Sequence, residues 1–246
     1  MMKNNDSKLL LEKTHDHSGS DSPKLTVVLI HGIASDSSAY NSALEYIEAK
    51  DTMKDIRFVT FDLLGSGKSQ KDDSLNYDYA DQLTALENSI AKLNLDTPLV
   101  LVGHSMGTFI VARYAKEHPG EVKELILLSP PVFTKRDFLN PAFPTAIKMF
   151  KEAVSVKHPE ILEDKAFTNS LDKIVLDKNN YKVLKGLTLP ITLIYGAKDQ
   201  IIASHNLPKL LKEKSNFTAI KTNGRHGITR DKYQKLPKIL ERIKNA

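Results

Sequence analysis

The chain has 246 residues, of which 41% are hydrophobic and 26% are charged, and its formal charge is +5. This composition excludes a disordered protein, and the length suffices for one buried core without metals or disulfides. The chain has no cysteine, which excludes disulfides, thiolate metal sites and a thiol nucleophile.

The two ends of the chain carry no targeting or nucleic-acid signal. Residues 1–23 hold only a three-leucine apolar run, much shorter than a signal-peptide core, and no other run could cross a bilayer. We therefore expect a cytoplasmic protein without stable membrane insertion; nothing in the sequence indicates an oligomeric state. Residues 208–246 are basic, but their two helical patterns contain no interleaved aromatic residue, so we expect solvated helix faces and no nucleic-acid partner.

Strands and helices alternate along the chain. Near-continuous apolar strands separated by helices indicate an α/β fold, with a mostly parallel sheet covered on both faces. Apolar and β-branched runs predict strands at 24–32, 56–62, 98–105, 123–130, 191–196 and 217–223. Helical spacing predicts helices at 37–50, 79–95, 106–120, 207–214 and 233–243.

The pattern divides the chain into three parts. Residues 1–23 form an N-terminal segment that is partly flexible; KLLLEK within it is a possible short edge strand, and the polar residues 14–23 are expected to form a loop. Residues 24–133 and 190–246 form the core domain. Residues 134–189 show helical patterns and no convincing strand, and such a long connection predicts a small helical insertion that caps the core.

The segment FDLLGSGKSQ, residues 61–70, resembles a phosphate-binding loop but fails its pattern. In GxxxxGK[ST] the first glycine lets successive backbone amides turn toward the phosphates. Counting back from Gly67 and Lys68, that position is Asp62, whose carboxylate would repel an anion. The glycines therefore need another role, and we expect Lys68 to point to solvent.

The pentapeptide GHSMG lies between a predicted strand and a predicted helix. In such a tight strand-to-helix turn, glycine is required at Gly103 and Gly107 because side chains there would clash. The turn exposes the hydroxyl of Ser105 at a helix N-terminus, where the helix dipole favours developing negative charge. We predict that Ser105 is a nucleophile.

A serine nucleophile needs a base, and the base needs an orienting acid. In this architecture the chain order is serine, then acid, then histidine. Asp199 follows the strand ITLIYG and His226 follows the strand FTAIKTN, so both are predicted at the carboxyl edge of the sheet. The rival pair His15 and His17 lies in the polar N-terminal loop without a third metal ligand.

The remaining histidines have simpler explanations. We expect His104 to pack beneath the turn and His31 to brace the neighbouring loop, while His118 and His158 precede prolines at helix ends and His205 lies near the start of a surface helix. An attacked carbonyl also needs donors for its oxyanion. The backbone amide of Met106 is one, and the loop HGIAS supplies the second, from Ile33 or alternatively Ala34.

Taken together, HG after the first long strand, GHSMG, GAKD and GRHG resemble the α/β-hydrolase superfamily across residues 24–246. In that family a DxxGxGxS loop precedes the nucleophile strand, which resembles Asp62, Gly65, Gly67 and Ser69, and a helical cap is common. The resemblance implies a Ser-His-Asp triad at Ser105, His226 and Asp199, with neither metal nor organic cofactor.

The resemblance implies acyl transfer to water, and we expect a carboxylesterase acting on small-molecule esters with small to medium acyl chains. Thioester hydrolysis, monoacylglycerol lipase activity and C–C bond hydrolysis remain alternatives, as does a ligand sensor that binds without turnover. Apolar residues in and beside the insertion either line an acyl pocket or dock the insertion onto the sheet. These residues are Phe133, Leu139, Phe143, Ile147, Met149 and Phe150.

Overall fold

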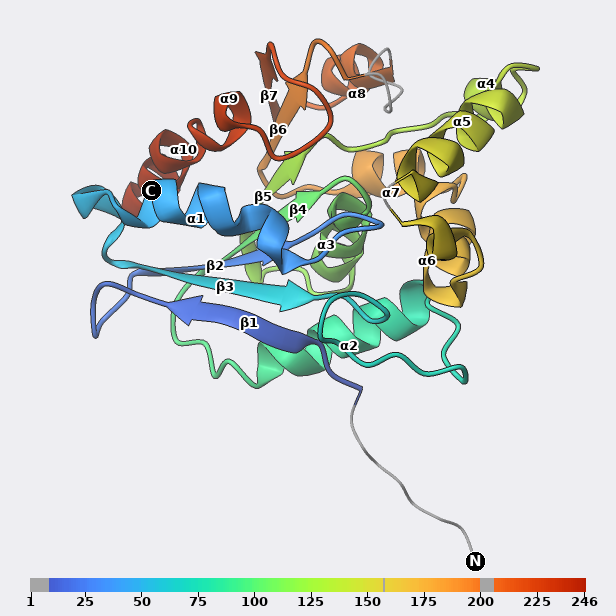
Figure 1. Cartoon of the computed structure of the whole chain (residues 1–246). Coiled ribbons are helices and arrows are strands. Elements are labelled where there is room, and N and C mark those ends of the chain that lie inside the picture. The colour runs from blue at the N-terminus through green and yellow to red at the C-terminus, as the bar shows by residue number, and fades with distance from the viewer. Residues whose placement is uncertain (1–8, 157, 200–205) are drawn as a thin grey trace, which may run out of the picture.

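The computed structural model of the protein describes residues 9–156, 158–199 and 206–246. Its centre is a seven-stranded sheet in the order β1-β3-β2-β4-β5-β6-β7 (Figure 1). All neighbouring strands are parallel except β1, which is antiparallel to β3. The strands are β1 (Glu12–His17), β2 (Leu25–Ile30), β3 (Ile56–Asp62), β4 (Leu99–His104), β5 (Val122–Leu128), β6 (Ile191–Gly196) and β7 (Phe217–Thr222).

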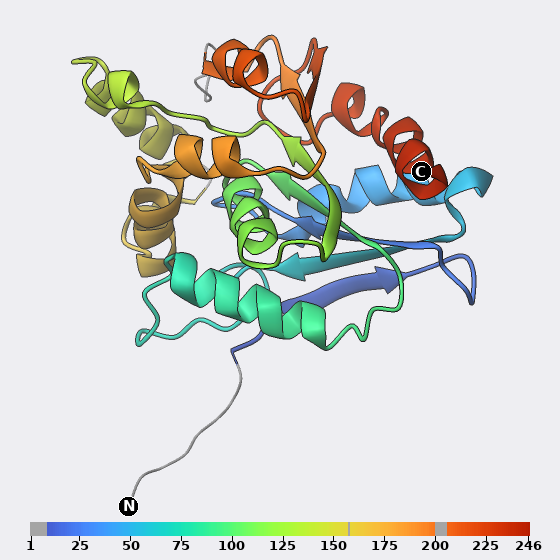
Figure 2. The same cartoon turned by 180° about the vertical axis from the view of Figure 1, so that it is seen from behind.

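Helices cover both faces of the sheet, which confirms the α/β fold predicted from the apolar strands. Helices α1 and α10 bury their apolar residues against one face, and α2 and α3 pack against the other (Figures 1 and 2). All residues of β2 and β4 are buried, as expected for central parallel strands. The core helices are α1 (Asn41–Glu48), α2 (Tyr79–Ala91), α3 (Met106–Glu117), α8 (Leu207–Glu213), α9 (Arg230–Tyr233) and α10 (Leu236–Asn245).

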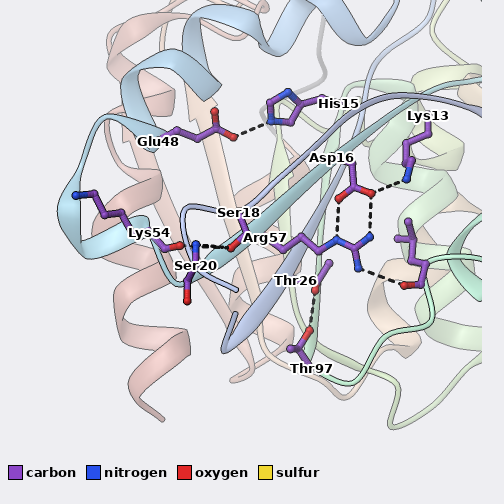
Figure 3. A network of polar contacts seen from close by, with 11 residues as sticks. Lys13, His15, Asp16, Ser18, Ser20, Thr26, Glu48, Lys54, Arg57 and Thr97 are labelled. Atoms are coloured by element: carbon purple, nitrogen blue, oxygen red, sulfur yellow. Dashed lines mark hydrogen bonds and ion pairs between the residues drawn. The ribbon is translucent and has the colours of Figure 1, made fainter. Parts of the chain in front are cut away.

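The edge strand β1 differs from the sequence prediction. The sequence predicts a loop from residue 14, but β1 runs to His17 and pairs with β3. Its side chains are mostly exposed, so no apolar pattern marks it. A cross-strand ion pair supports it instead: Arg57 donates from Nε and Nη2 to the two carboxylate oxygens of Asp16, at 2.7 and 2.8 Å (Figure 3). His15, expected in that loop, donates from Nε2 to the carboxylate of Glu48 at 2.7 Å.

Residues 134–189 contain helices and, among those described, no strand. The helices are α4 (Lys135–Phe138), α5 (Phe143–Ser155), η3 (Pro159–Leu162), α6 (Lys165–Ser170), the π-helical turn η4 (Leu171–Val175) and α7 (Asn180–Gly186). They gather at one end of the sheet (Figure 1), and residues 134–189 are referred to below as the cap.

The cap is anchored to the core by polar contacts with α2 and α3. Tyr79 donates from its hydroxyl to the carbonyl oxygen of Ile174 at 3.2 Å. The guanidinium of Arg113 lies 3.6 Å from the centre of the Tyr79 ring and also pairs with the carboxylate of Asp177. These contacts fix the end of the cap that contains η4 and α7.

Candidate active site

Ser105 lies at the sharp turn between β4 and α3, with φ 49° and ψ −115°. Few residues other than glycine adopt this backbone conformation, and its strain is typical of functional turns. A Cβ atom on Gly103 would lie 2.6 Å from the carbonyl oxygen of Gly107, and one on Gly107 would lie 2.5 Å from that of His31. Both glycines are therefore required by close backbone approach, as the sequence predicts.

The structure brings Ser105, His226 and Asp199 together in one hydrogen-bonded chain. Nε2 of His226 lies 2.9 Å from the hydroxyl oxygen of Ser105, and Nδ1 of His226 lies 2.9 Å from Oδ2 of Asp199. The Asp199 side chain is fully buried, whereas that of His226 is 16% exposed. A carboxylate can only accept, so Nδ1 carries the proton and Nε2 is free to accept one from Ser105.

His104 and His31 pack under these groups as uncharged imidazoles. Nε2 of His104 lies 3.0 Å from the carbonyl oxygen of His226, to which it must donate. Burial, helped by the neighbouring His226, lowers the pKa of His104 to about 3. Nε2 of His31 accepts from the amide of Leu63 at 2.9 Å, and burial lowers the pKa of His31 as well. Both side chains thus brace the loops that carry the site.

Ile33 and Met106, the residue after Ser105, both line one cavity of about 270 Å³. Within the described ranges, neither of their backbone amides donates a hydrogen bond to the protein. Ala34 follows with φ 54°, so the loop after β2 turns sharply at this point. Two unpartnered amides beside a serine hydroxyl are the arrangement that can stabilise an oxyanion.

The GSGKS segment folds around the carboxylate of Asp62, to which one of its backbone amides donates. Asp62 accepts from the backbone amides of Ser37 and Lys68, each at 2.8 Å. Gly65 and Gly67 have positive φ values of 78° and 50°, and a Cβ atom on Gly67 would overlap the Asp62 carboxylate. The Lys68 side chain is exposed, as predicted.

Cap residues other than those expected line the cavity. The cap side of the cavity is formed by residues of η3 and α6, including Ile161, Ala166 and Phe167. Of the apolar residues that the sequence suggested for an acyl pocket, Leu139 is 81% exposed and Met149 is 64% exposed. Phe133, Phe138 and Phe143 instead pack edge to face in a cluster with ring centres 5.0 to 6.1 Å apart.

Sequence reasoning missed Lys232, which is buried beside the site. It precedes the amphipathic pattern at the C-terminus and resembles the many exposed lysines there, so no local signal distinguishes it. Its ammonium donates to the carbonyl oxygen of His226 at 3.0 Å.

The expected positions of His15 and His17 in a loop were wrong, because both lie in β1. Among the described residues, no group of three or more potential ligands could hold a metal. His205 lies outside the described residues.

A family model described as the alpha/beta hydrolase fold matches residues 26–174, which is more than half of the chain. The chain therefore belongs to the alpha/beta hydrolase family. In the part of the chain that the structure describes, no helix is long and apolar enough to span a membrane.

Curated relatives match over part of their length. The chain is 35% identical over 117 residues to a probable lysophospholipase, BODYGUARD 2, of Arabidopsis thaliana, covering 47% of this chain and 25% of that protein. It is 33% identical over 118 residues to the 1-acylglycerol-3-phosphate O-acyltransferase ABHD5 of Rattus norvegicus, covering 47% of this chain and 32% of that protein. The matches thus span about a quarter to a third of these relatives.

Solved structures resemble almost the whole chain. An esterase from Exiguobacterium antarcticum has a TM-score of 0.70 at 21% identity, covering 94% of both chains. A monoacylglycerol lipase from Paleococcus ferrophilus has a TM-score of 0.68 at 20% identity, covering 96% of this chain and 98% of that one. At these identities the likeness establishes the fold, which is that of esterases and lipases.

Proposed function

We propose that the protein is a serine hydrolase that cleaves carboxylic esters through a Ser-His-Asp triad. The observation that carries this proposal is the chain of two 2.9 Å contacts from Asp199 through His226 to Ser105. Esterases and lipases among the fold's neighbours support the reaction class. The same arrangement also suits a thioester, which differs only in its leaving group.

In the first step, Ser105 attacks the ester carbonyl carbon while Nε2 of His226 takes the hydroxyl proton. The carbonyl oxygen becomes an oxyanion that accepts from the amides of Ile33 and Met106. The imidazolium, held by Asp199, then gives its proton to the leaving alcohol as the carbon–oxygen bond breaks. The acyl group remains attached to Ser105.

In the second step, water attacks the acyl-enzyme. Nε2 of His226 takes one proton from the water, and the new oxyanion occupies the same two amides. Its collapse releases the carboxylic acid and returns the proton to the hydroxyl of Ser105. The net reaction consumes one ester and one water and yields one acid and one alcohol.

The cavity supports a preference for small substrates. Its volume of about 270 Å³ lies just below the range of roughly 300 to 1,000 Å³ found for pockets that take drug-sized ligands. Polar and apolar residues both line the cavity, and its apolar part, from Leu64, Ile161 and Phe167, suits a short acyl chain. We therefore propose a small-molecule ester with a small to medium acyl chain as the substrate.

A series of p-nitrophenyl esters from acetate to decanoate tests this proposal. We expect turnover with the shorter esters and its loss in Ser105→Ala by several orders of magnitude, as for other triad serines. The control Ser22→Ala, on the exposed segment before β2, should hydrolyse normally and react with a fluorophosphonate probe. Multiple turnover that survives in Ser105→Ala contradicts the assignment; binding without turnover in the unmodified protein indicates a sensor.

A further inference from the structure

Lys232, in the short helix α9, has a fully buried side chain. Burying an ammonium group is costly unless its protons are all hydrogen-bonded. Desolvation lowers the pKa of Lys232, and the nearby carboxylates of Asp199 and Asp231 oppose that effect. A charge in this position therefore needs a structural or functional reason.

The partners of Lys232 are concentrated on the loop that carries His226. Its Nζ atom donates to three successive carbonyl oxygens, those of Arg225, His226 at 3.0 Å and Gly227 at 2.8 Å. Carbonyl oxygens can only accept, so they select the protonated amine. Hydrogen bonds to a charged group are also stronger than neutral ones.

The fourth partner of Lys232 connects this loop to the sheet. Nζ also lies 2.8 Å from the hydroxyl oxygen of Ser129, which follows β5 with φ 51°. The amide of Ser129 donates to the carbonyl oxygen of Ile194 in β6 at 2.8 Å. One ammonium thus joins the His226 loop, α9 and the carboxyl end of β5.

Other hydrogen bonds also support the loop: the carbonyl oxygens of Gly224 and Gly227 accept from the amides of Lys198 at 3.0 Å and Thr229 at 2.9 Å. Residues 223–229, between β7 and α9, form no regular element. His104 supplies a second donor to the carbonyl oxygen of His226, whereas among the hydrogen bonds of the described residues the carbonyl oxygen of Arg225 accepts only from Lys232. Without the ammonium, the carbonyl oxygen of Arg225 would lose its donor, and those of His226 and Gly227 would each keep one.

We propose that Lys232 is a positioning residue that orients His226 between Ser105 and Asp199 by gathering the carbonyl groups of its loop. This inference rests on the proposed function for its effect on turnover, although its effect on His226 geometry does not. Lys232 touches neither Ser105 nor the cavity that Ile33 and Met106 border. It therefore acts through the backbone of residues 225–227.

The test replaces Lys232 by Met, which keeps the length of the side chain but removes every donor. Lys235→Met is the matched control, because Lys235 is exposed only three residues away. We expect kcat for p-nitrophenyl butyrate to fall by about ten- to a hundredfold in Lys232→Met, since small misplacements of a catalytic group cost this much. KM should change by less than about twofold, and Lys235→Met should match the unmodified protein.

Loss of stability alone must be separated from loss of orientation. Ile239 is buried beneath α10, so Ile239→Ala should leave a cavity there and lower the melting temperature. This variant provides the comparison. The kcat of each variant is measured at the same interval below its own melting temperature. If kcat falls no more in Lys232→Met than in Ile239→Ala, the positioning role is refuted. Lys232→Gln, which keeps an amide donor, should recover part of the loss and replaces Lys232→Met if that variant does not fold.

A spectroscopic measurement tests the same inference without any substrate. The Nδ1 proton that His226 shares with Asp199 should give a downfield proton resonance, assigned by its loss in His226→Gln. We expect this signal to shift or broaden in Lys232→Met and to stay unchanged in Lys235→Met. An unchanged signal in Lys232→Met overturns the proposal. A protein with the expected signals but no ester turnover would refute the proposed function alone.

Discussion

The imidazole of His104 donates from Nε2 to the backbone carbonyl oxygen of His226 at 3.0 Å. This contact assigns the proton of His104 to Nε2 and leaves Nδ1 without a hydrogen-bond partner among the described residues. A second proton on Nδ1 would be a buried, unpaired charge. His104 is therefore neutral in the folded state, and lowering the pH should reduce the stability of that state.

The first prediction concerns stability between pH 6.5 and about 4.5. The pKa of His104 is lowered from 6.5 to about 3 in the folded protein. Below pH 6.5 the unfolded chain binds a proton that the folded chain does not, so stability falls as pH falls, by at most about 1.4 kcal/mol per pH unit. His104→Gln keeps a donor for the carbonyl oxygen and does not titrate. Urea unfolding should show a shallower loss in this variant.

His118 provides a control of opposite sign. Contacts with Glu87 and Glu121 raise the pKa of His118 despite its partial burial. Protonation of His118 therefore adds stability as pH falls through its raised folded pKa to 6.5, and this contribution is constant below 6.5. We expect His118→Gln to lower stability but to keep the pH slope of the unmodified protein between pH 6.5 and about 4.5. A pH slope in His104→Gln equal to that of the unmodified protein and His118→Gln would contradict the assignment of His104 as a buried neutral group.

The second prediction concerns Asp199. Its carboxylate holds the proton of His226 on Nδ1, which leaves Nε2 able to accept from Ser105. An asparagine can donate toward Nδ1 and so stabilise the wrong tautomer, a change that costs about ten-thousandfold in kcat in a serine protease. We expect Asp199→Asn to lower kcat for short esters by about a thousandfold or more, with a smaller change in KM. Steady-state kinetics with p-nitrophenyl acetate measure this; a loss below tenfold would argue against the triad.

The positions of Ser105, Asp199 and His226 could be predicted because each depends on a local pattern at a strand end. Apolar strands are readable from the sequence, and parallel strands bring their carboxyl ends to one edge. The turn at Gly103 and Gly107 adds a steric requirement that only glycine meets. Sequence order then suffices to place the three side chains together.

The possible edge strand at residues 8–13 overlaps β1 only at Glu12 and Lys13. The rest of β1 and the role of Lys232 could not be predicted, because they depend on distant partners. Strand β1 is exposed and polar, and the ion pair that supports it joins Asp16 to Arg57, more than forty residues away. Lys232 is one lysine among many, and its partner Ser129 lies 103 residues away. The contacts that give these charged and polar residues their structural roles form only when the chain folds.

The third prediction tests the support of the edge strand. The guanidinium of Arg57 holds the pKa of Asp16 at about 2, below its usual 3.8. Their fork-to-fork geometry gives two hydrogen bonds, but the pair is partly exposed, so we expect Arg57→Ala to cost about 1 kcal/mol at neutral pH. That contribution is present above pH 3.8 and is lost as pH falls through 2. Urea unfolding at low salt should show the difference, and no difference would mean that β1 needs no such pair.

The fourth prediction compares substitutions of Gly67 and Lys68, two neighbouring residues of GSGKS. Gly67 has φ 50° and lies against Asp62, so Gly67→Ala adds both a left-handed strain and an overlap with a carboxylate. We expect a loss of more than about 1 kcal/mol in stability. Lys68→Ala keeps the amide that Asp62 accepts from, and the Lys68 side chain is exposed, so stability should change by less than about 0.5 kcal/mol.

Thermal unfolding and ester hydrolysis distinguish these two variants. Gly67→Ala should also reduce turnover, because Asp62 accepts from the amide of Ser37 in the segment that follows the loop of Ile33. Lys68→Ala should hydrolyse short esters at the normal rate, whereas a phosphate-binding lysine would be essential. A large loss in Lys68→Ala together with a silent Gly67→Ala would restore a ligand-binding role for this loop. A loss in Gly67→Ala with normal turnover in Lys68→Ala makes Gly67 part of the scaffold that holds the cavity beside Met106.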